Sequence, residues 1–407
     1  MAEFNPFDPR LRSNPYAVYK ELRDEAPVHW SEVMQLWVLT RYDDVLAVLR
    51  DHGRFSSERT RATNRFVKAL EEYRNASGPI GRTPTMLSID PPAHTRMRNL
   101  VNQAFTPRVV ERIRPHIGEI ADELIDALPE PGRIDVVKDL AETLPVIVIA
   151  EVLGIPKEDR LRFKGWSNDI AGTLGGPFQP ADVLERAQRS ANELADYFRE
   201  QIEMRRGAPR DDLLSAMIAA EEQGDLLSED EMLATCILLL VAGNETTTNL
   251  IGNGMLALLE HPDQLRLLQE DPSLMPAAVD EMLRYDGPAQ MTSRIVVEDM
   301  EFEGQKMAAG QVVLAILGAA NHDPAQFENA DSFDIKRFAN RNLAFGYGIH
   351  YCLGAPLALA EAQVAIETLL RRFPEPHAAF ETPEWGASFI LRGLKSLKLE
   401  SKVPSQP

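Results

Sequence analysis

The amino-acid sequence predicts a mainly α-helical protein with minor β-sheets. Apolar residues recur at spacings of three and four over long stretches of the 407 residues, which is the pattern of helices that bury one face. Strand-like alternation is confined to the short pieces Leu36–Tyr42, Arg294–Val297 and Val312–Leu317. One predicted helix is also long enough, and apolar enough on most faces, to cross the centre of a domain.

Five further stretches carry the helical spacing most clearly. They are Pro15–Glu25, Pro91–Phe105, Val109–Leu128, Ala181–Arg206 and Pro356–Arg372. The segment Ser56–Thr85 is long, polar and charged, and Gly78-Pro79 and Thr83-Pro84 interrupt it. The two ends, about residues 1–10 and 402–407, are expected to be frayed.

The long helix has a clear start and stop. Ser228 is followed three residues later by Glu231, which is a capping box, and His261-Pro262 ends the apolar run. At 1.5 Å per residue the rod is roughly 46 Å long. Its middle, residues 242–248, reads Ala-Gly-Asn-Glu-Thr-Thr-Thr, which is a poor sequence for a buried helix centre. Such a local conflict often marks a functional site.

Charge and cysteine content exclude several classes of protein. Lys plus Arg is 43 and Asp plus Glu is 62, so the net charge of −19 argues against nucleic acid and anionic membrane surfaces as partners. Two cysteines make a disulfide framework implausible and favour a reducing compartment. The first ten residues lack an apolar signal region, and the longest apolar run is about half of a membrane span. We expect a cytoplasmic protein.

The strongest chemical signal lies at residues 345–355, Phe-Gly-Tyr-Gly-Ile-His-Tyr-Cys-Leu-Gly-Ala. Two glycines permit an irregular backbone, and Cys352 stands just before Pro356, which suits the first turn of a helix. A thiolate there faces free backbone N–H groups and the positive end of the helix dipole, as a metal-ligating thiolate needs. The alternative is a buried structural cysteine, the commonest fate of a lone Cys.

This stretch resembles the cysteine-ligand loop of the cytochrome P-450 superfamily at Phe345, Gly346, Gly348, His350, Cys352 and Gly354. Chance agreement at these positions is on the order of 10⁻⁸ per starting point. Residues 242–246, Ala-Gly-Asn-Glu-Thr, resemble the oxygen-activating segment of the family's central helix. Residues 281–284 resemble its ExxR motif, and residues 333–337 the segment whose arginine joins that pair.

The resemblance implies the fold and the cofactor. The fold is a single triangular domain spanning residues 1–407, with the long central helix over the haem, and this overrides the two or three domains that length alone suggests. The cofactor is haem b, with the Cys352 thiolate as the ligand to the metal. The cofactor-binding residues implied are His94, Arg98, Arg294 and His350 at the haem propionates, with Phe345 and Gly354 in the loop. For His94 and Arg98, at i and i+4 of a helix, a solvated basic face is the alternative.

The resemblance also implies the catalytic residues Ala242, Gly243, Glu245 and Thr246. Gly243 removes a side chain where dioxygen must fit, the Thr246 hydroxyl orders water, and Glu245 helps to relay protons. The alternative is that the threonine bonds back to a helix carbonyl and the glutamate points to water. Glu281 and Arg284 are neighbours at i and i+3, and by resemblance Arg337 joins them in a structural clamp. We assign Cys236 to inert packing.

The function implied is that of a monooxygenase, which inserts one oxygen atom of O2 into a C–H bond or C=C bond of a hydrophobic small molecule. The chain has no nucleotide fingerprint and no iron–sulfur cysteine set, so we expect electrons to come from separate proteins. The resemblance to soluble bacterial members of the family implies that these are a ferredoxin and a ferredoxin reductase. A peroxide-driven peroxygenase of the same fold and a non-catalytic haem sensor are the alternatives. We expect a monomer.

Two sets of residues in the sequence refine this function. The residues expected to line the pocket include Met86, Leu87, Leu239, Val241, Met291 and Phe389. The candidates for ferredoxin docking are Arg96, Arg108, Arg112 and Arg341, with Arg337 committed to the clamp.

Overall fold

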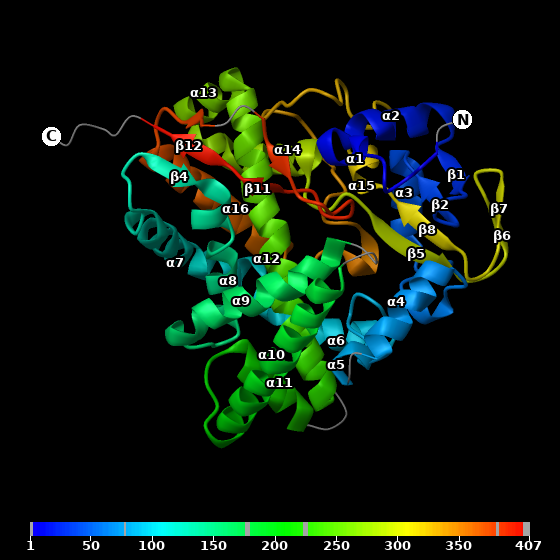
Figure 1. Ribbon diagram of the computed structural model, residues 1–407, viewed down its shortest axis with the longest axis horizontal. Helices are drawn as coiled ribbons and strands as arrows, with labels where there is room; N and C mark the ends of the chain where they lie inside the picture. Colours follow the sequence, from blue (N-terminus) through cyan, green and yellow to red (C-terminus); the bar gives the residue numbers. More distant parts are fainter. Residues whose placement is uncertain (1–2, 77–78, 176–179, 223–226, 380–381, 402–407) are drawn as a thin grey trace.

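The computed structural model describes residues 3–76, 79–175, 180–222, 227–379 and 382–401. Most of it is helical, and α12 (Glu229–Glu260) runs through the middle of the molecule (Figure 1). The other helices of eight or more residues are α2 (Pro15–Glu25), α3 (Tyr42–Arg50), α4 (Arg65–Ala76), α6 (Ala93–Asn102), α7 (Pro107–Asp126), α8 (Leu144–Val152), α9 (Arg160–Ala171), α10 (Ala181–Gly207), α11 (Leu213–Glu222), α13 (Pro262–Glu270), α14 (Met275–Asp286) and α16 (Ala355–Arg372). Helices α1 (Arg10–Ser13), α5 (Pro79–Arg82) and α15 (Leu317–Ala320) are single turns.

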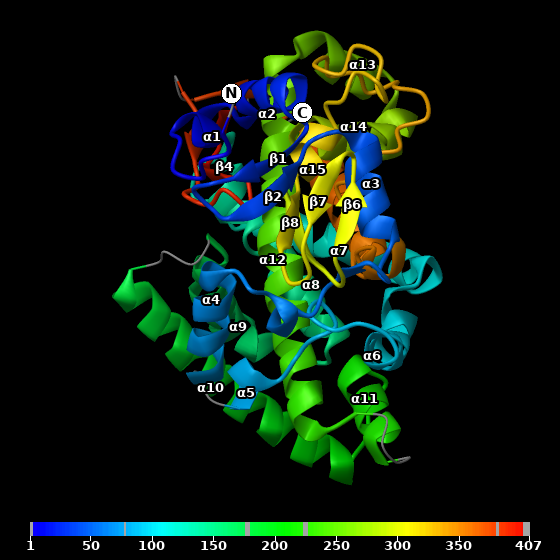
Figure 2. The same cartoon turned by 90° about the vertical axis from the view of Figure 1, so that its right-hand side faces the viewer.

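Helix α12 begins and ends where its sequence predicts. The Ser228 hydroxyl accepts a hydrogen bond from the Glu231 N–H, and the Glu231 carboxylate accepts one from the Ser228 N–H, which completes the capping box. The helix has 32 residues and stays continuous through residues 242–248. In Figure 2 this helix runs from top to bottom through the molecule. Helices α8, α9, α14 and α16 pack around it, and its side chains are buried on most faces.

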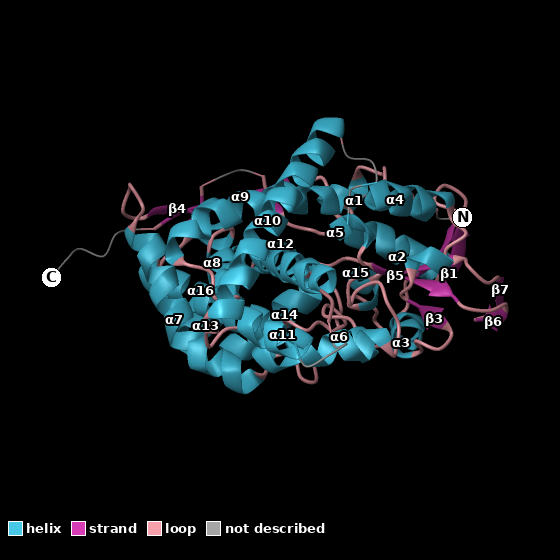
Figure 3. Ribbon diagram, turned by 90° about the horizontal axis from the view of Figure 1, so that it is seen from below, coloured by secondary structure: helices cyan, strands magenta, loops and turns pink. Residues whose placement is uncertain are grey.

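A five-stranded sheet lies at one end of the molecule, together with the hairpin of β6 (Met300–Phe302) and β7 (Gln305–Met307) (Figure 3). Its strand order is β1 (Val28–Ser31), β2 (Leu36–Leu39), β8 (Val312–Ala315), β5 (Thr292–Val296) and β3 (Phe55–Ser56), with only β2 and β8 parallel. The smaller sheets pair β4 (Arg133–Asp135), β12 (Lys398–Glu400) and β9 (His377–Ala378), then β10 (Glu384–Trp385) with β11 (Leu394–Ser396), and β6 (Met300–Phe302) with β7 (Gln305–Met307).

The largest apolar cluster surrounds α12, and two smaller ones lie against the five-stranded sheet. The arrangement brings the middle of α12 close to α16 and to the loop before it. Segments that are about 100 residues apart in the sequence therefore share one interior space. Within the described ranges, no helix combines the length and the apolar character needed to cross a membrane.

One expectation about the chain is corrected. The N-terminus is not frayed throughout, because Phe4 is fully buried and the Ser31 hydroxyl donates to its carbonyl. The polar segment 56–85, in which neither helix nor strand is predicted, contains helices α4 and α5. Residues 402–407 lie outside the described residues, so the expectation for that end stays a prediction.

Candidate active site

A cavity of about 410 Å³ lies between the middle of α12, the loop before α16, strand β5 and residues 86–87. Of the residues predicted from the sequence for the site, it brings together Ala242, Gly243, Thr246, Arg294, Phe345, His350, Cys352 and Gly354. His94 and Arg98 do not line the cavity, but they contact residues of the Cys352 loop. The His94 ring lies 4.4 Å from the His350 ring, and Arg98 donates to the Tyr351 carbonyl.

The loop that carries Cys352 has an irregular backbone that two glycines make possible. Gly346 and Gly348 have φ values of +70° and +72°, a region that other residues rarely adopt. A Cβ at Gly348 would lie 2.7 Å from the Leu49 carbonyl oxygen, so α3 also requires glycine there. The loop closes where the Cys352 N–H donates to the Phe345 carbonyl at 2.9 Å, and α16 begins at once after it.

The Cys352 sulfur lies between opposing influences. Burial raises the pKa of its thiol, whereas the N–H groups of Gly354 and Ala355 and the charge of Arg98 favour the thiolate. Burial has the larger effect, so the pKa of this thiol lies above its usual value in the absence of a bound metal ion. A bound metal ion supplies the missing positive charge, because coordination deprotonates a thiol. The donor set therefore fits a metal-ligating cysteine.

Four cationic or ionisable side chains gather on one edge of the cavity: His94, Arg98, Arg294 and His350. Burial, together with Arg294 and His94, lowers the pKa of His350 to about 3, and burial lowers that of Arg294 to about 10. Arg294 forms no ion pair with any described residue, and the buried Nε2 of His94 has no hydrogen-bond partner there. Two arginines beside two neutral imidazoles, each able to donate a hydrogen bond, fit a ligand with two carboxylates, as haem has.

The opposite wall of the cavity is α12. The Thr246 hydroxyl donates to the Ala242 carbonyl at 2.8 Å, which is the helix bond of the alternative interpretation, whereas Oε2 of Glu245 is buried and does not point to water. A Cβ added at Gly243 would meet open space. Glu245 does not line the cavity, although its neighbour in the sequence, Thr246, does. Its Oε2 is buried without a hydrogen-bond partner among the described residues, and burial raises its pKa to about 7. This carboxyl therefore exchanges a proton with its surroundings near neutral pH.

One polar residue of the cavity was not predicted from the sequence. Glu361 of α16 lines the cavity, is 2% exposed and forms a hydrogen bond with Thr247 of α12. Burial raises the pKa of its carboxyl to about 8, so it is mostly protonated at neutral pH. Its signal in the sequence is a lone acid inside the apolar run Leu357–Ile366, which is also the pattern of an ordinary exposed helix position.

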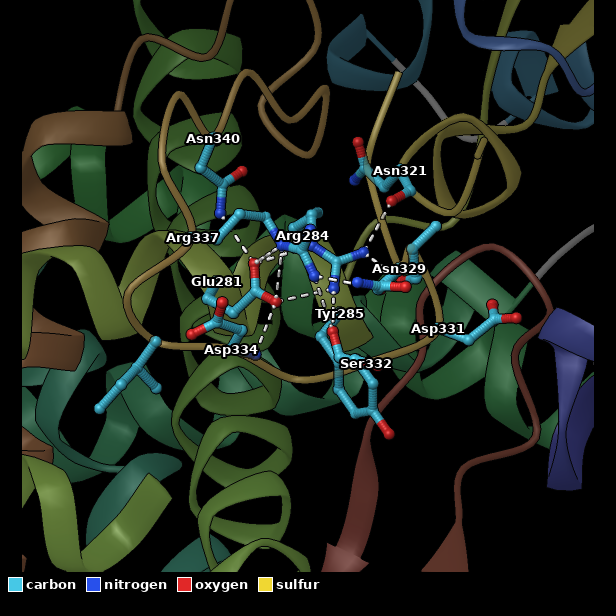
Figure 4. A network of polar contacts seen from close by, with 12 residues as sticks. Glu281, Arg284, Tyr285, Asn321, Asn329, Asp331, Ser332, Asp334, Arg337 and Asn340 are labelled. Carbon is cyan, nitrogen blue, oxygen red and sulfur yellow. Dashed lines mark hydrogen bonds and ion pairs between the residues drawn. The ribbon is translucent and has the colours of Figure 1, made fainter. Parts of the chain in front are cut away.

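Behind the loop, Glu281 is the centre of a buried polar network (Figure 4). Its carboxylate accepts hydrogen bonds from Arg284, from Arg337, from the Asn340 amide and from the Asp334 N–H. Arg284 also donates to the carbonyls of Asn321, Ala330 and Ser332. The predicted clamp of Glu281, Arg284 and Arg337 is therefore present, and it fixes the chain between α15 and the Cys352 loop.

Three candidates from the sequence analysis are corrected by the packing. Val241 and Phe389 do not line the cavity, because Val241 packs in the core and Phe389 against the sheet. Arg96 is not available to a partner, because both of its terminal nitrogens bind Glu231 of the α12 capping box. The cavity instead gains Phe105, Pro145, Ile149, Leu250 and Leu317.

Comparison with known proteins agrees with this geometry. The model of the family described as Cytochrome P450 matches residues 10–376, and the chain belongs to that family. Members hold haem through a cysteine thiolate, and relatives named as monooxygenases and hydroxylases support the same enzyme class for this chain. The mostly helical architecture with small sheets is the P450 fold.

Three relatives illustrate the likeness. The polyketide biosynthesis cytochrome P450 PksS of Bacillus subtilis (strain 168) is 39% identical over 97% of each chain, and its solved structure has a TM-score of 0.88 with 98% of this chain and 100% of that chain covered. The vitamin D(3) 25-hydroxylase of Pseudonocardia autotrophica is 41% identical over 94% of this chain and 93% of its own length. A myxobacterial cytochrome P450 in complex with myristic acid is 42% identical, with a TM-score of 0.88 and coverage of 97% and 98%.

Proposed function

We propose that this chain inserts one oxygen atom of O2 into a C–H or C=C bond of a hydrophobic small molecule, with haem b held by the Cys352 thiolate. The observation that carries the proposal is the single cavity that unites Cys352, Arg294 and His350 with Gly243 and Thr246. When bound, a haem with a thiolate ligand supplies the chemistry of O–O bond cleavage. The rest of the reaction depends on what the residues of this chain hold, orient and protonate.

The haem-binding residues have separate tasks in this proposal. Cys352 holds the iron, while His94, Arg98, Arg294 and His350 bind the two propionates. Phe345 belongs to the Cys352 loop, where its ring lies 6.2 Å from that of Tyr351. A Cβ at Gly354 would point into open space, so glycine keeps that surface clear for a flat ligand.

On the α12 side, the proposed proton route uses Glu245 and Thr246. The Glu245 carboxyl, with a pKa of about 7, exchanges protons with the surroundings. The Thr246 hydroxyl, fixed by the Ala242 carbonyl, orients water beside the space that Gly243 leaves open. Glu361 of α16, which forms a hydrogen bond with Thr247 of α12, holds a further proton at neutral pH.

The substrate proposed is a hydrophobic molecule of moderate size. Leu238 and Leu239 of α12, together with Met86, Leu87 and Met291, make the cavity wall mostly apolar. A steroid-like or fatty-acid-like molecule fits this lining, in keeping with relatives that are named for vitamin D(3) or solved with myristic acid.

The electron donor proposed is an acidic ferredoxin, reduced by its own reductase. The exposed cations that remain available beside the Cys352 loop and on α7 are Arg108, Arg112 and Arg341. Arg114 is held by Glu111 and Gln363, and Arg337 by Glu281. In a chain of net charge −19, these cations offer an acidic partner a local attractive field.

Replacing Thr246 by alanine tests this function. The variant is expected to keep its haem and its substrate affinity but to form several-fold less product per reduced nicotinamide consumed, because water beside the cavity loses its anchor. The measurement is the ratio of product to reduced nicotinamide in a ferredoxin-supported assay, with hydrogen peroxide determined in parallel. The same variant supplied with peroxide instead of electrons should retain its activity. An unchanged ratio in the first assay would favour a peroxygenase.

A further inference from the structure

A second cavity lies beside the C-terminal part of α12, apart from the cavity that contains Cys352. Its volume is about 480 Å³, and none of the described residues lines both cavities. Helix α2, the end of α14 and strand β10 complete its walls, together with Arg392 and His322. A volume of this size is typical of small-molecule sites, which measure roughly 300–1,000 Å³.

The cations that line this cavity already have partners. Arg392 is 9% exposed, its Nε donates to Asp286 at 2.7 Å, and its guanidinium lies 3.4 Å from the centre of the Trp385 ring. The Lys20 ammonium forms an ion pair with Asp24, which does not line the cavity. Neither cation is therefore available to balance another carboxylate.

The carboxylates of the cavity are not balanced in the same way. The Glu260 side chain has no ion pair or hydrogen bond with any described residue. Asp331 pairs with the His322 ring at 3.3 Å, but burial lowers the pKa of that imidazole, so it is neutral near pH 7. Asp286 accepts its hydrogen bonds at Oδ1, and its Oδ2 has no partner among the described residues. This excess of negative charge favours a cationic ligand.

These three carboxylates lie around one aromatic side chain, Tyr285. Burial raises the pKa of its phenol, and the charges of all three carboxylates raise it further. The side chains of Tyr285 and Asp331 point away from the Glu281 network (Figure 4). The Tyr16 ring lines the cavity as well. Aromatic faces attract cations, so these rings add to the preference for a positive ligand.

A buried amide supplies a further hydrogen-bond acceptor. Asn253 of α12 lines the cavity and is 2% exposed. Its Nδ2 donates to the carbonyls of Asp286 and Arg392, both at 3.0 Å, which fixes the orientation of the amide. Its Oδ1 is buried and has no hydrogen-bond partner among the described residues. Because buried polar atoms are nearly always paired, this oxygen indicates a ligand that carries N–H donors.

An organic cation fits this cavity better than a metal ion does. The described residues contain no group of three or more His, Cys, Asp or Glu side chains that could hold a metal ion. Glu260 lies on α12 and Asp331 on the chain after α15, so negative charge comes from more than one wall. We propose that this cavity binds a small aliphatic diamine, whose ammonium groups pair with Glu260 and Asp331 and donate to Asn253.

The experiment is a calorimetric titration of the haem-loaded protein with putrescine at low ionic strength. One putrescine is expected to bind per chain without a change in the Soret band, because the amine does not reach the iron. Glu260→Gln and Asp331→Asn should each weaken binding about 10-fold, since each removes a charged partner of the ammonium groups. Both residues are exposed, so the variants keep the fold. Glu270→Gln, which removes an exposed carboxylate from α13, is the matched control and should bind as the wild type does.

Two analogues separate the effect of charge from that of shape. The monoamine n-butylamine should bind about 10-fold more weakly than putrescine, and the neutral butanediol should give no saturable heat.

Three results would overturn the inference. One is the absence of saturable putrescine binding at about 10 mM. Another is the same affinity in Glu260→Gln, Asp331→Asn and the wild type, which would place the amine elsewhere. The third is a Soret shift that follows the calorimetric saturation, since the amine would then bind the iron.

Discussion

The Arg284→Ala variant is expected to unfold more easily by about 3–5 kcal/mol and to accumulate with little or no haem. Arg284 and Glu281 are fully buried, so removing the guanidinium leaves a carboxylate short of its main partner. It also leaves the carbonyls of Asn321 and Ala330 without their donor, whereas the Ser332 carbonyl keeps Arg337. Because the total stability of a protein is commonly about 5–15 kcal/mol, the loss is a large fraction of the whole.

The measurements are the urea midpoint and the ratio of haem to protein in purified material. Arg284→Lys should fail almost as badly, because an ammonium group cannot serve two carboxylate oxygens and three carbonyls from one planar fork. Lys20→Ala breaks an exposed i, i+4 pair with Asp24 and should change stability by less than about 1 kcal/mol. A stable, haem-loaded Arg284→Ala protein would show that the Glu281 network does not hold the Cys352 loop.

The Glu245→Gln variant is expected to form product about 10²–10⁴-fold more slowly, while it keeps its haem and binds substrate as before. The amide has the shape of the carboxyl but cannot release a proton. Since burial raises the pKa of Glu245 to about 7, the carboxyl is protonated below that pH and ionised above it. Product per reduced nicotinamide in the wild type should therefore decline as the pH rises through about 7, and this step should be absent from the variant.

The measurement is the rate of product formation and the product formed per reduced nicotinamide consumed, both between pH 6 and 8, with haem reduction by dithionite in parallel. Asp230→Asn removes an exposed carboxylate from the first turn of the same helix and should leave rate and profile as in the wild type. If the Glu245→Gln profile overlaid that of the wild type, the buried carboxyl would have no part in proton delivery.

The parts of this protein that the sequence predicts are those determined by neighbours in the chain. The Ser228 capping box and His261-Pro262 mark the two ends of α12, and i, i+3 spacing puts Glu281 beside Arg284. The positive φ values of Gly346 and Gly348 follow from a local turn. Cys352 could be singled out because its loop is one continuous stretch with a recognisable family pattern.

The parts that were missed depend on partners far away in the sequence. Arg96 looks like an exposed docking residue until α12 brings Glu231, 135 residues away, against it. Glu361 looks like an ordinary helix position until Thr247 lies opposite. The sequence does not show which residues of α12 line the cavity and which pack in the core. A helix that is buried on all sides has no apolar periodicity that separates the two, and Val241, expected in the cavity, packs in the core.

The central claim, that Cys352 is the thiolate ligand of a haem iron, is tested most directly by the carbon monoxide spectrum of the reduced protein. The wild type is expected to show the red-shifted band of thiolate-ligated haem. Cys236→Ser should keep it, because Cys236 is fully buried and burial raises the pKa of its thiol to about 12. Cys352→Ser should lose the band completely. A red-shifted band that survives in Cys352→Ser but disappears in Cys236→Ser would contradict the account.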